Sequence, residues 1–236
     1  MPGASSRVGG RLRQSRRGRT ISQMRAVGWL WALVRGAVPV ADLDPFRSLG
    51  FEAYDLIDGL APGAARAAAW NAFVLQTYAD KLVTACRTGA FVAAETADAA
   101  ENIYRLAGVW VARAHELAAN PAGAAQATLA DPMYHWHTPI RSEGELRGMR
   151  ETLDALRVQL AFELQRRGTQ LPPGLREQLA TVEAKLETAD GLFVRRAPAE
   201  LRGGIGTALA LGLDTAFRLG QEIAMAAAAD PARELS

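Results

Sequence analysis

The sequence has a single cysteine, Cys86, and no uncharged run of 18 residues. One cysteine excludes an internal disulfide framework and a metal cluster held by several thiolates of this chain. The missing apolar run means that the sequence predicts no transmembrane helix. Hydrophobic residues nevertheless make up 49% of the 236 residues and charged residues 22%. This composition supplies enough apolar surface for a folded core and is unlike that of a disordered protein.

Lysine is also scarce, since only Lys81 and Lys185 accompany 25 arginines. That ratio, together with abundant alanine, is typical of a high-GC bacterium, so single arginines are weak evidence for specific ion pairing. The arginines are unevenly placed. Residues 1–41 carry eight arginines and no acid, whereas residues 42–236 carry 19 basic and 25 acidic residues. The sequence therefore divides into a basic arm, residues 1–41, and an acidic body, residues 42–236.

The basic arm has several interpretations. Its Gly-, Ser- and Arg-rich start is typical of a disordered tail, and a start codon assigned too early would leave the same pattern. Arg16 and Arg17 ahead of an apolar stretch resemble a twin-arginine signal in outline, although Arg35 interrupts that stretch. An acid-free segment with Arg and Ser also fits an organelle transit peptide.

The end of the arm contains apolar residues at helical spacing, namely Val27, Leu30, Trp31, Val34 and Val38. This stripe either packs on the body or lies on an anionic membrane surface. The arginines could instead bind nucleic-acid phosphates, without sequence specificity because no aromatic residues interleave with them. For either surface the contact residues are Arg16, Arg17, Arg19, Arg25, Trp29 and Trp31. The predicted location is the cytoplasm, with membrane association if the arm binds lipid.

The body has helical hydrophobic spacing and no stretch that alternates apolar with polar residues. We predict an all-α fold, a bundle of five to six helices without a sheet. The expected helices are Pro45–Leu60, Ala64–Arg87, Ala90–Ala119, 142–167, Gly174–Asp190 and Pro198–Ala229.

Two of these helices have the clearest sequence signals. Ser142 and Glu145 form a capping box, in which each side chain bonds the other residue's backbone N–H. A seam of apolar residues follows at spacings of three and four: Leu146, Met149, Leu153, Leu156 and Leu160. Because only Thr169–Pro173 separates this helix from the next, the two must lie side by side. We predict an antiparallel, coiled-coil-like hairpin over about residues 142–190.

The last helix carries small residues at every fourth position: Ala208, Gly212, Ala216, Gly220, Ala224 and Ala228. Such a row allows another backbone to approach closely. The approaching helix belongs either to the same chain, the preferred interpretation of the packing, or to a second copy. The functional hypothesis uses the second alternative, self-association of a homo-oligomer through Ala208, Gly212, Ala216, Gly220 and Ala224.

The segment of residues 131–137 holds the residues most suggestive of chemistry. His135 and His137 point the same way in an extended segment and could bind one metal ion, with His115 as a third ligand. A pocket between helices could instead be lined by polar and aromatic side chains, namely His115, Tyr134, Trp136, Trp110 and Asn71. Nucleophile and phosphate-loop motifs do not occur, and no cofactor is indicated.

The sequence favours a non-catalytic helical interaction or scaffolding protein that self-associates. One alternative is a ligand-binding or metal-dependent helical enzyme with its site at residues 131–137. The other is a peripheral membrane protein held by its arm.

Overall fold

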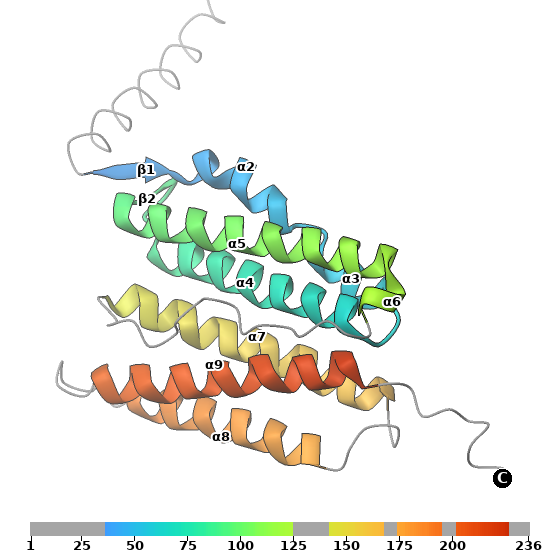
Figure 1. Ribbon diagram of the computed structural model, residues 1–236. Helices are drawn as coiled ribbons and strands as arrows, with labels where there is room; N and C mark the ends of the chain where they lie inside the picture. The colour runs from blue at the N-terminus through green and yellow to red at the C-terminus, as the bar shows by residue number, and fades with distance from the viewer. Residues whose placement is uncertain (1–35, 125–141, 168–173, 195–201, 227–236) are drawn as a thin grey trace, which may run out of the picture.

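The computed structural model describes residues 36–124, 142–167, 174–194 and 202–226. Over these residues it is an all-α bundle with a minimal sheet, which confirms the predicted fold class (Figure 1). Five long helices build it: α4 (Ala64–Cys86), α5 (Ala94–Ala119), α7 (Glu143–Arg167), α8 (Gly174–Val194) and α9 (Arg202–Met225). Within the described residues, no helix has the length and apolar character needed to cross a membrane.

The long helices are arranged around α4. Figure 1 shows α5 on one side of α4, α7 and α9 on the other, and α8 outermost, below α9. The sequence explains the central place of α4, because its alanines let neighbouring helices approach on several sides. Ala67, Ala68, Ala69, Ala72 and Ala79 have no exposed surface. The core is therefore one continuous layer of apolar side chains that extends from α5 to α8.

The predicted first helix, Pro45–Leu60, is wrong in detail. The chain instead forms short pieces: η1 (Val40–Leu43), α2 (Asp44–Arg47), η2 (Ser48–Gly50) and α3 (Ala53–Gly59). Ser48 Oγ donates a hydrogen bond to the Pro45 carbonyl at 2.7 Å. Such local side-chain bonds compete with a regular helix, and Gly50, two positions later, is a poor helix former. The interruption bends this segment so that it follows the surface of α5 and α4.

The prediction of a body without strands is also wrong at one place. β1 (Ala37–Pro39) pairs antiparallel with β2 (Phe91–Ala93), with Val38 opposite Val92. Strands of three residues are too short to show an alternating pattern in sequence. The pairing places residues 37–39 in the body, ahead of the boundary expected at residue 42. It also places Val38 in a strand rather than at the end of the helical stripe.

The helical hairpin and its capping box are confirmed. The Ser142 N–H donates to Glu145 Oε2 at 2.8 Å, and the Glu145 N–H donates to Ser142 Oγ at 3.2 Å. The predicted seam is buried to at least 98%: Leu146, Met149, Leu153, Leu156 and Leu160. Arg150 of α7 forms a two-pronged ion pair with Asp190 of α8, at 2.8 and 2.9 Å. The hairpin does not protrude, because its α7 seam packs into the bundle against α4 and α9.

The Arg150–Asp190 pair predicts a pH dependence. Hydrogen bonding to Arg150 lowers the pKa of Asp190 below its ordinary value, so folding favours the charged carboxylate. A lowered pKa adds stability that is complete above the unfolded pKa and is lost as the pH falls through the folded pKa. Asp190→Asn should lower the free energy of unfolding by less than about 1 kcal/mol near pH 7, since the pair is partly exposed. Its difference from the wild type should shrink below about pH 4.

Thermal unfolding at about pH 7 and about pH 3 measures this effect. Glu187→Gln, on the exposed side of α8, is the control and should show no such convergence. A constant difference between Asp190→Asn and the wild type at both pH values contradicts the prediction.

Candidate functional site

The row of small residues on α9 faces the interior of the bundle. Gly212, Ala216, Gly220 and Ala224 are buried, and Ala208 is half-buried. A Cβ at Gly212 would lie 2.6 Å from Leu153 Cδ2 of α7, and one at Gly220 would overlap the indole of Trp70. The predicted close approach therefore exists, but the partners are helices of the same chain. This corrects the assignment of the row as a self-association face, since a second copy could reach it only by displacing α4 and α7.

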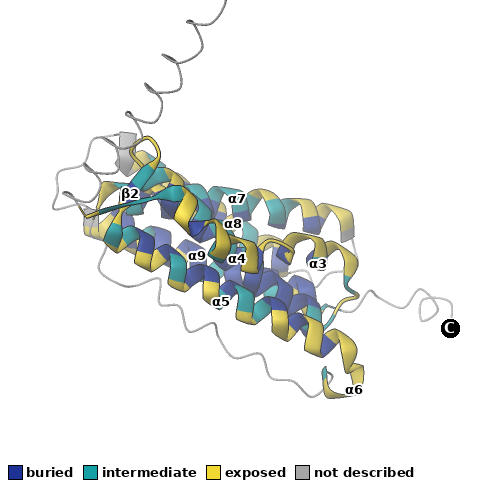
Figure 2. Ribbon diagram, turned by 90° about the horizontal axis from the view of Figure 1, so that it is seen from above, coloured by how far each residue is buried: buried dark blue, intermediate teal, exposed yellow. Residues whose placement is uncertain are grey.

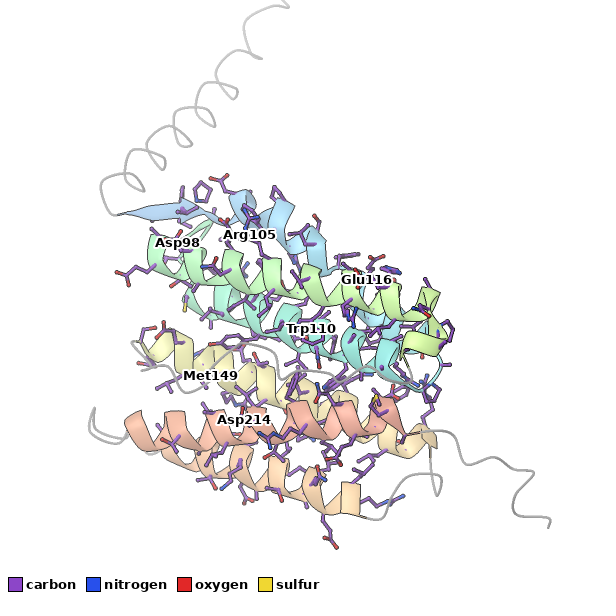
Figure 3. The ribbon with its side chains drawn as sticks, viewed as in Figure 1. Asp98, Arg105, Trp110, Glu116, Met149 and Asp214 are labelled. Carbon is purple, nitrogen blue, oxygen red and sulfur yellow. The ribbon has the colours of Figure 1, made fainter. Side chains whose placement is uncertain are left out.

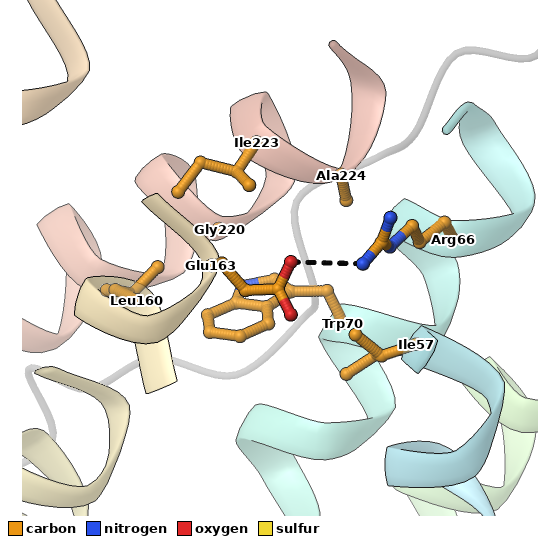
Figure 4. Close-up of a pocket in the computed structure, with 8 residues that line it drawn as sticks. All are labelled: Ile57, Arg66, Trp70, Leu160, Glu163, Gly220, Ile223 and Ala224. Atoms are coloured by element: carbon orange, nitrogen blue, oxygen red, sulfur yellow. Dashed lines mark hydrogen bonds and ion pairs between the residues drawn. The ribbon is translucent and has the colours of Figure 1, made fainter. Parts of the chain in front are cut away.

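Trp70 is at the centre of a junction of α3, α4, α7 and α9. Its indole N–H donates to the Phe217 carbonyl at 3.0 Å, which fixes the ring against α9. Beside the ring is a small cavity, drawn in Figure 4. It is lined by Ile57, Arg66, Trp70, Leu160, Glu163, Gly220, Ile223 and Ala224. The cavity offers about 10 Å³ to a water-sized sphere, the lower limit for one water molecule and too little for a substrate.

A buried ion pair closes this junction. Arg66 of α4 donates to Glu163 of α7 at 3.0 Å, and both side chains are only 5% exposed (Figure 4). Arg166 lies 3.5 Å from the same carboxylate and also binds Asp58 of α3. Burial lowers the pKa of the Arg66 guanidinium, and the charge of Glu163 opposes that shift. The charges alternate in sign along the row Arg66, Glu163, Arg166 and Asp58, and each group is paired with the next. The row joins α3, α4 and α7. Because each of these groups is engaged in an ion pair, the arrangement is unsuited to acid–base catalysis.

This network was not predicted from the sequence. Its signal is the isolation of Arg66, the one charged residue in the otherwise uncharged segment of residues 64–79. A single charge in such a segment is buried with a partner or lies at a helix edge. The partner could not be found from the sequence, because Glu163 lies 97 positions further along the chain.

A second polar cluster gathers around Asp80 of α4. Tyr104 Oη donates to Asp80 Oδ1 at 2.7 Å, and Arg47 Nε lies 2.9 Å from the same oxygen. Gln76 Nε2 donates to Oδ2 at 3.3 Å. Burial, followed by the charge of Asp80, raises the pKa of Tyr104, so the phenol stays a proton donor at neutral pH. The cluster joins α2 and α5 to α4 and leaves the carboxylate with several donors, as in a structural site.

Three residues of the predicted ligand pocket are described by the structure, Asn71, Trp110 and His115, and they do not line a common pocket. Asn71 is buried, and its Oδ1 accepts from Gln221 Nε2 of α9 at 2.9 Å. His115 instead lies 3.1 Å from Glu52 Oε1 beside α3, with half of its side chain exposed. Trp110 packs in a small apolar cluster with Ala53, Ala72, Val111, Leu56 and Phe73. Each residue thus has its own surroundings, and this corrects the pocket as far as Asn71, Trp110 and His115 are concerned.

The other predicted site residues lie outside the described residues. These are the loop residues Tyr134, His135, Trp136 and His137, and the arm residues Arg16, Arg17, Arg19, Arg25, Trp29 and Trp31. In the part of the chain that the structure describes, no three His, Cys, Asp or Glu side chains gather as metal ligands would. Burial raises the pKa of the Cys86 thiol, which makes it a poor nucleophile at neutral pH.

Within the part of the chain that the structure describes, negative charge is concentrated in residues 36–59 together with α5, which we call the acidic layer. It contains nine acidic and three basic residues, and its charge of −6 equals that of residues 42–236 as a whole. Figure 3 labels Asp98, Arg105 and Glu116, which follow one another along α5 at the edge of the bundle. Figure 2 shows the same side from above, with exposed residues along α3 and α5.

Specific contacts fix the two parts of the acidic layer in register. The Arg105 guanidinium lies 4.6 Å from the centre of the Phe46 ring. Leu49 packs on Gly108, where a Cβ would lie only 2.9 Å from Leu49 Cβ. Residues 46–52 therefore run along α5 from position 105 to His115, which bonds Glu52.

Apolar side chains are exposed in this acidic surrounding. Phe51 is 74% exposed, Val109 of α5 is 63% exposed and Leu49 is 44% exposed. Leu49 packs on Gly108, the neighbour of Val109 in α5, so Leu49 and Val109 belong to one part of the surface. Phe51 follows Leu49 by two positions. Phe51 lies within the helix predicted over Pro45–Leu60, and its exposure was not predicted from the sequence.

Comparison of the chain with protein-family models, with curated proteins and with solved structures gives no match.

Proposed function

We propose that the protein is a non-catalytic helical interaction protein whose acidic layer binds a cationic amphipathic segment. The observation that carries the proposal is the 74% exposure of Phe51 within a surface of charge −6. Large apolar side chains exposed on one layer of a protein, as Phe51, Leu49 and Val109 are here, are typical of an interaction surface. The surrounding carboxylates select for positive charge in the partner.

The partner's chemistry follows from the two parts of the surface. Covering Phe51 and Val109 supplies apolar contact, worth about 1.5 to 3 kcal/mol for each side chain that becomes fully buried. The net negative charge of the acidic layer attracts a basic segment over a range of about 10 Å and increases its association rate. A helix with an apolar stripe and flanking Arg or Lys meets both requirements.

The rest of the fold supports a rigid binding platform. The acidic layer is attached to α4 through Asp80, which accepts from Tyr104 and pairs with Arg47. α4 is in turn fixed to α7 by Arg66 and Glu163. A preformed surface loses little conformational entropy on binding, which favours a role in recognition for this side of the bundle.

A binding experiment tests the proposal with a synthetic peptide of about 18 residues, composed of Leu and Lys in an amphipathic helical pattern. The full-length protein should bind it, and Phe51→Ser with Val109→Ser should weaken binding by about tenfold or more, as expected for the loss of about 1.4 kcal/mol. Affinity should also fall as salt is added, because carboxylates attract the peptide. Isothermal titration calorimetry at two salt concentrations gives both results.

The matched control is Val158→Ser with Phe162→Ser. These residues are 55% and 51% exposed on α7, outside the acidic layer. The control variant should bind the peptide as the wild type does. Equal loss in both double variants, or an affinity that ignores salt, contradicts the proposal.

A further inference from the structure

We infer that the chain supplies its own ligand: residues 20–35 dock on the acidic layer of the same molecule. This inference rests on the proposed function and names the partner of that surface. The point at which the arm joins the body, the length of the segment and its charge support this docking.

The arm joins the body next to the acidic layer. The Ala94 N–H, at the start of α5, donates to the Gly36 carbonyl at 2.7 Å. β1 follows at once and is paired with β2, which leads directly into α5. Gly36 is therefore held at the N-terminal end of α5, and the arm precedes it directly in the chain, so binding within one molecule benefits from a high effective concentration.

The length of the segment matches the distance to the exposed apolar side chains. At ~1.5 Å per residue, α5 covers about 22 Å between Ala94 and Val109. Residues 20–35, coiled as a helix, would cover the same length. A helix that runs back along α5 from residue 35 would thus bring Ile21 and Met24 to the level of Leu49 and Val109.

The sequence of the segment complements the surface. Ile21, Met24, Val27, Trp31 and Val34 are spaced by three, three, four and three positions, which is one face of a helix. Residues 20–35 carry two arginines and no acid, a charge of +2, and the preceding residues 1–19 add six arginines, against a charge of −6 on the acidic layer. A docked arm would cover Phe51 and Val109 and would have to be displaced by any external cationic segment.

Electron paramagnetic resonance on the full-length chain tests this arrangement. In a Cys86→Ser background, spin labels are attached at Gly28→Cys and Ala118→Cys, the latter exposed in the last turn of α5. A docked arm gives a narrow distance distribution near about 25 Å, from a helical rise of ~1.5 Å per residue. Val27→Ser with Trp31→Ser should broaden it, and so should about 1 M salt, which screens charges.

A reference pair, Ala118→Cys with Glu183→Cys on α8, lies entirely on the body and gives the width expected for a rigid pair. A distribution for the 28–118 pair that is broad in the wild type and unchanged by Val27→Ser with Trp31→Ser overturns the inference. The arm could also dock on a second copy of the chain. Mixing protein labelled only at position 28 with protein labelled only at position 118 tests this, because a dipolar signal then arises between molecules. Such a signal also overturns docking within one molecule.

The Leu/Lys peptide keeps this inference distinct from the proposed function. If the arm occupies the acidic layer, Val27→Ser with Trp31→Ser should bind the peptide about tenfold more tightly than the wild type does. Equal binding to both proteins contradicts arm docking and leaves the proposed function standing. If neither protein binds the peptide, the proposed function itself fails.

Discussion

Replacing Gly220 with alanine should lower the free energy of unfolding by about 2 to 3 kcal/mol, because the added methyl group overlaps the Trp70 indole. The ring cannot move aside easily, since its N–H is bonded to the Phe217 carbonyl of α9 at 3.0 Å. The gain of about 1 kcal/mol in helix propensity offsets only part of the strain. Urea-induced unfolding followed by circular dichroism measures the change.

The same helix provides the matched control. Cβ atoms at Gly203 and Gly204 would meet no atom within 4 Å. Gly203→Ala and Gly204→Ala should therefore leave stability unchanged or raise it by up to about 1 kcal/mol. Combining Gly220→Ala with Trp70→Phe should cost less than the sum of the two single changes, since the smaller ring makes room for the methyl group. A neutral Gly220→Ala would contradict the packing of α9 on α4.

Replacing Glu163 with alanine should lower the free energy of unfolding by about 3 to 5 kcal/mol. The change leaves the Arg66 guanidinium buried without its carboxylate, and an unpaired buried charge is far more costly than a lost surface contact. Arg166 loses the same partner, although its second pair with Asp58 lies at the surface. Chemical denaturation gives the magnitude.

Two variants separate the cost of an unpaired charge from the loss of an ordinary ion pair. Arg66→Met with Glu163→Leu replaces both charges by apolar groups and should recover most of the lost stability. Glu101→Ala removes an exposed pair with Arg105, at 2.8 Å, and should cost less than about 0.5 kcal/mol. If Glu163→Ala were as mild as Glu101→Ala, the junction at Trp70 would not be a buried site.

The parts of the fold that could be predicted are those with local signals. The bounds of α4 follow from an alanine-rich stretch with few charged residues that begins after Pro62 and Gly63 and ends at Cys86. The start of α7 follows from a capping box, which involves two side chains three positions apart. The antiparallel packing of α7 and α8 follows from a connection too short for any other arrangement.

The parts that could not be predicted depend on contacts between distant residues. β1 forms only because residues 37–39 meet residues 91–93, and neither segment has strand character alone. The row of small residues on α9 correctly predicted a close approach, but the spacing does not say which backbone approaches. Trp70 decides that question, and it lies 150 residues before Gly220. The acidic layer likewise requires α5 to return beside residues 36–59.

The short sheet has a mechanical consequence for the N-terminal end of the body. A pull on the arm acts first on β1, whose three residue pairs with β2 and single bond from Ala94 to Gly36 form the attachment. Beyond them, Val40 donates one further bond to the Ala90 carbonyl. Tension on the arm should therefore detach residues 36–40 from β2 and α5 first. The helices joined at Trp70 and by the Arg66–Glu163 ion pair should stay folded at forces that separate β1 from β2.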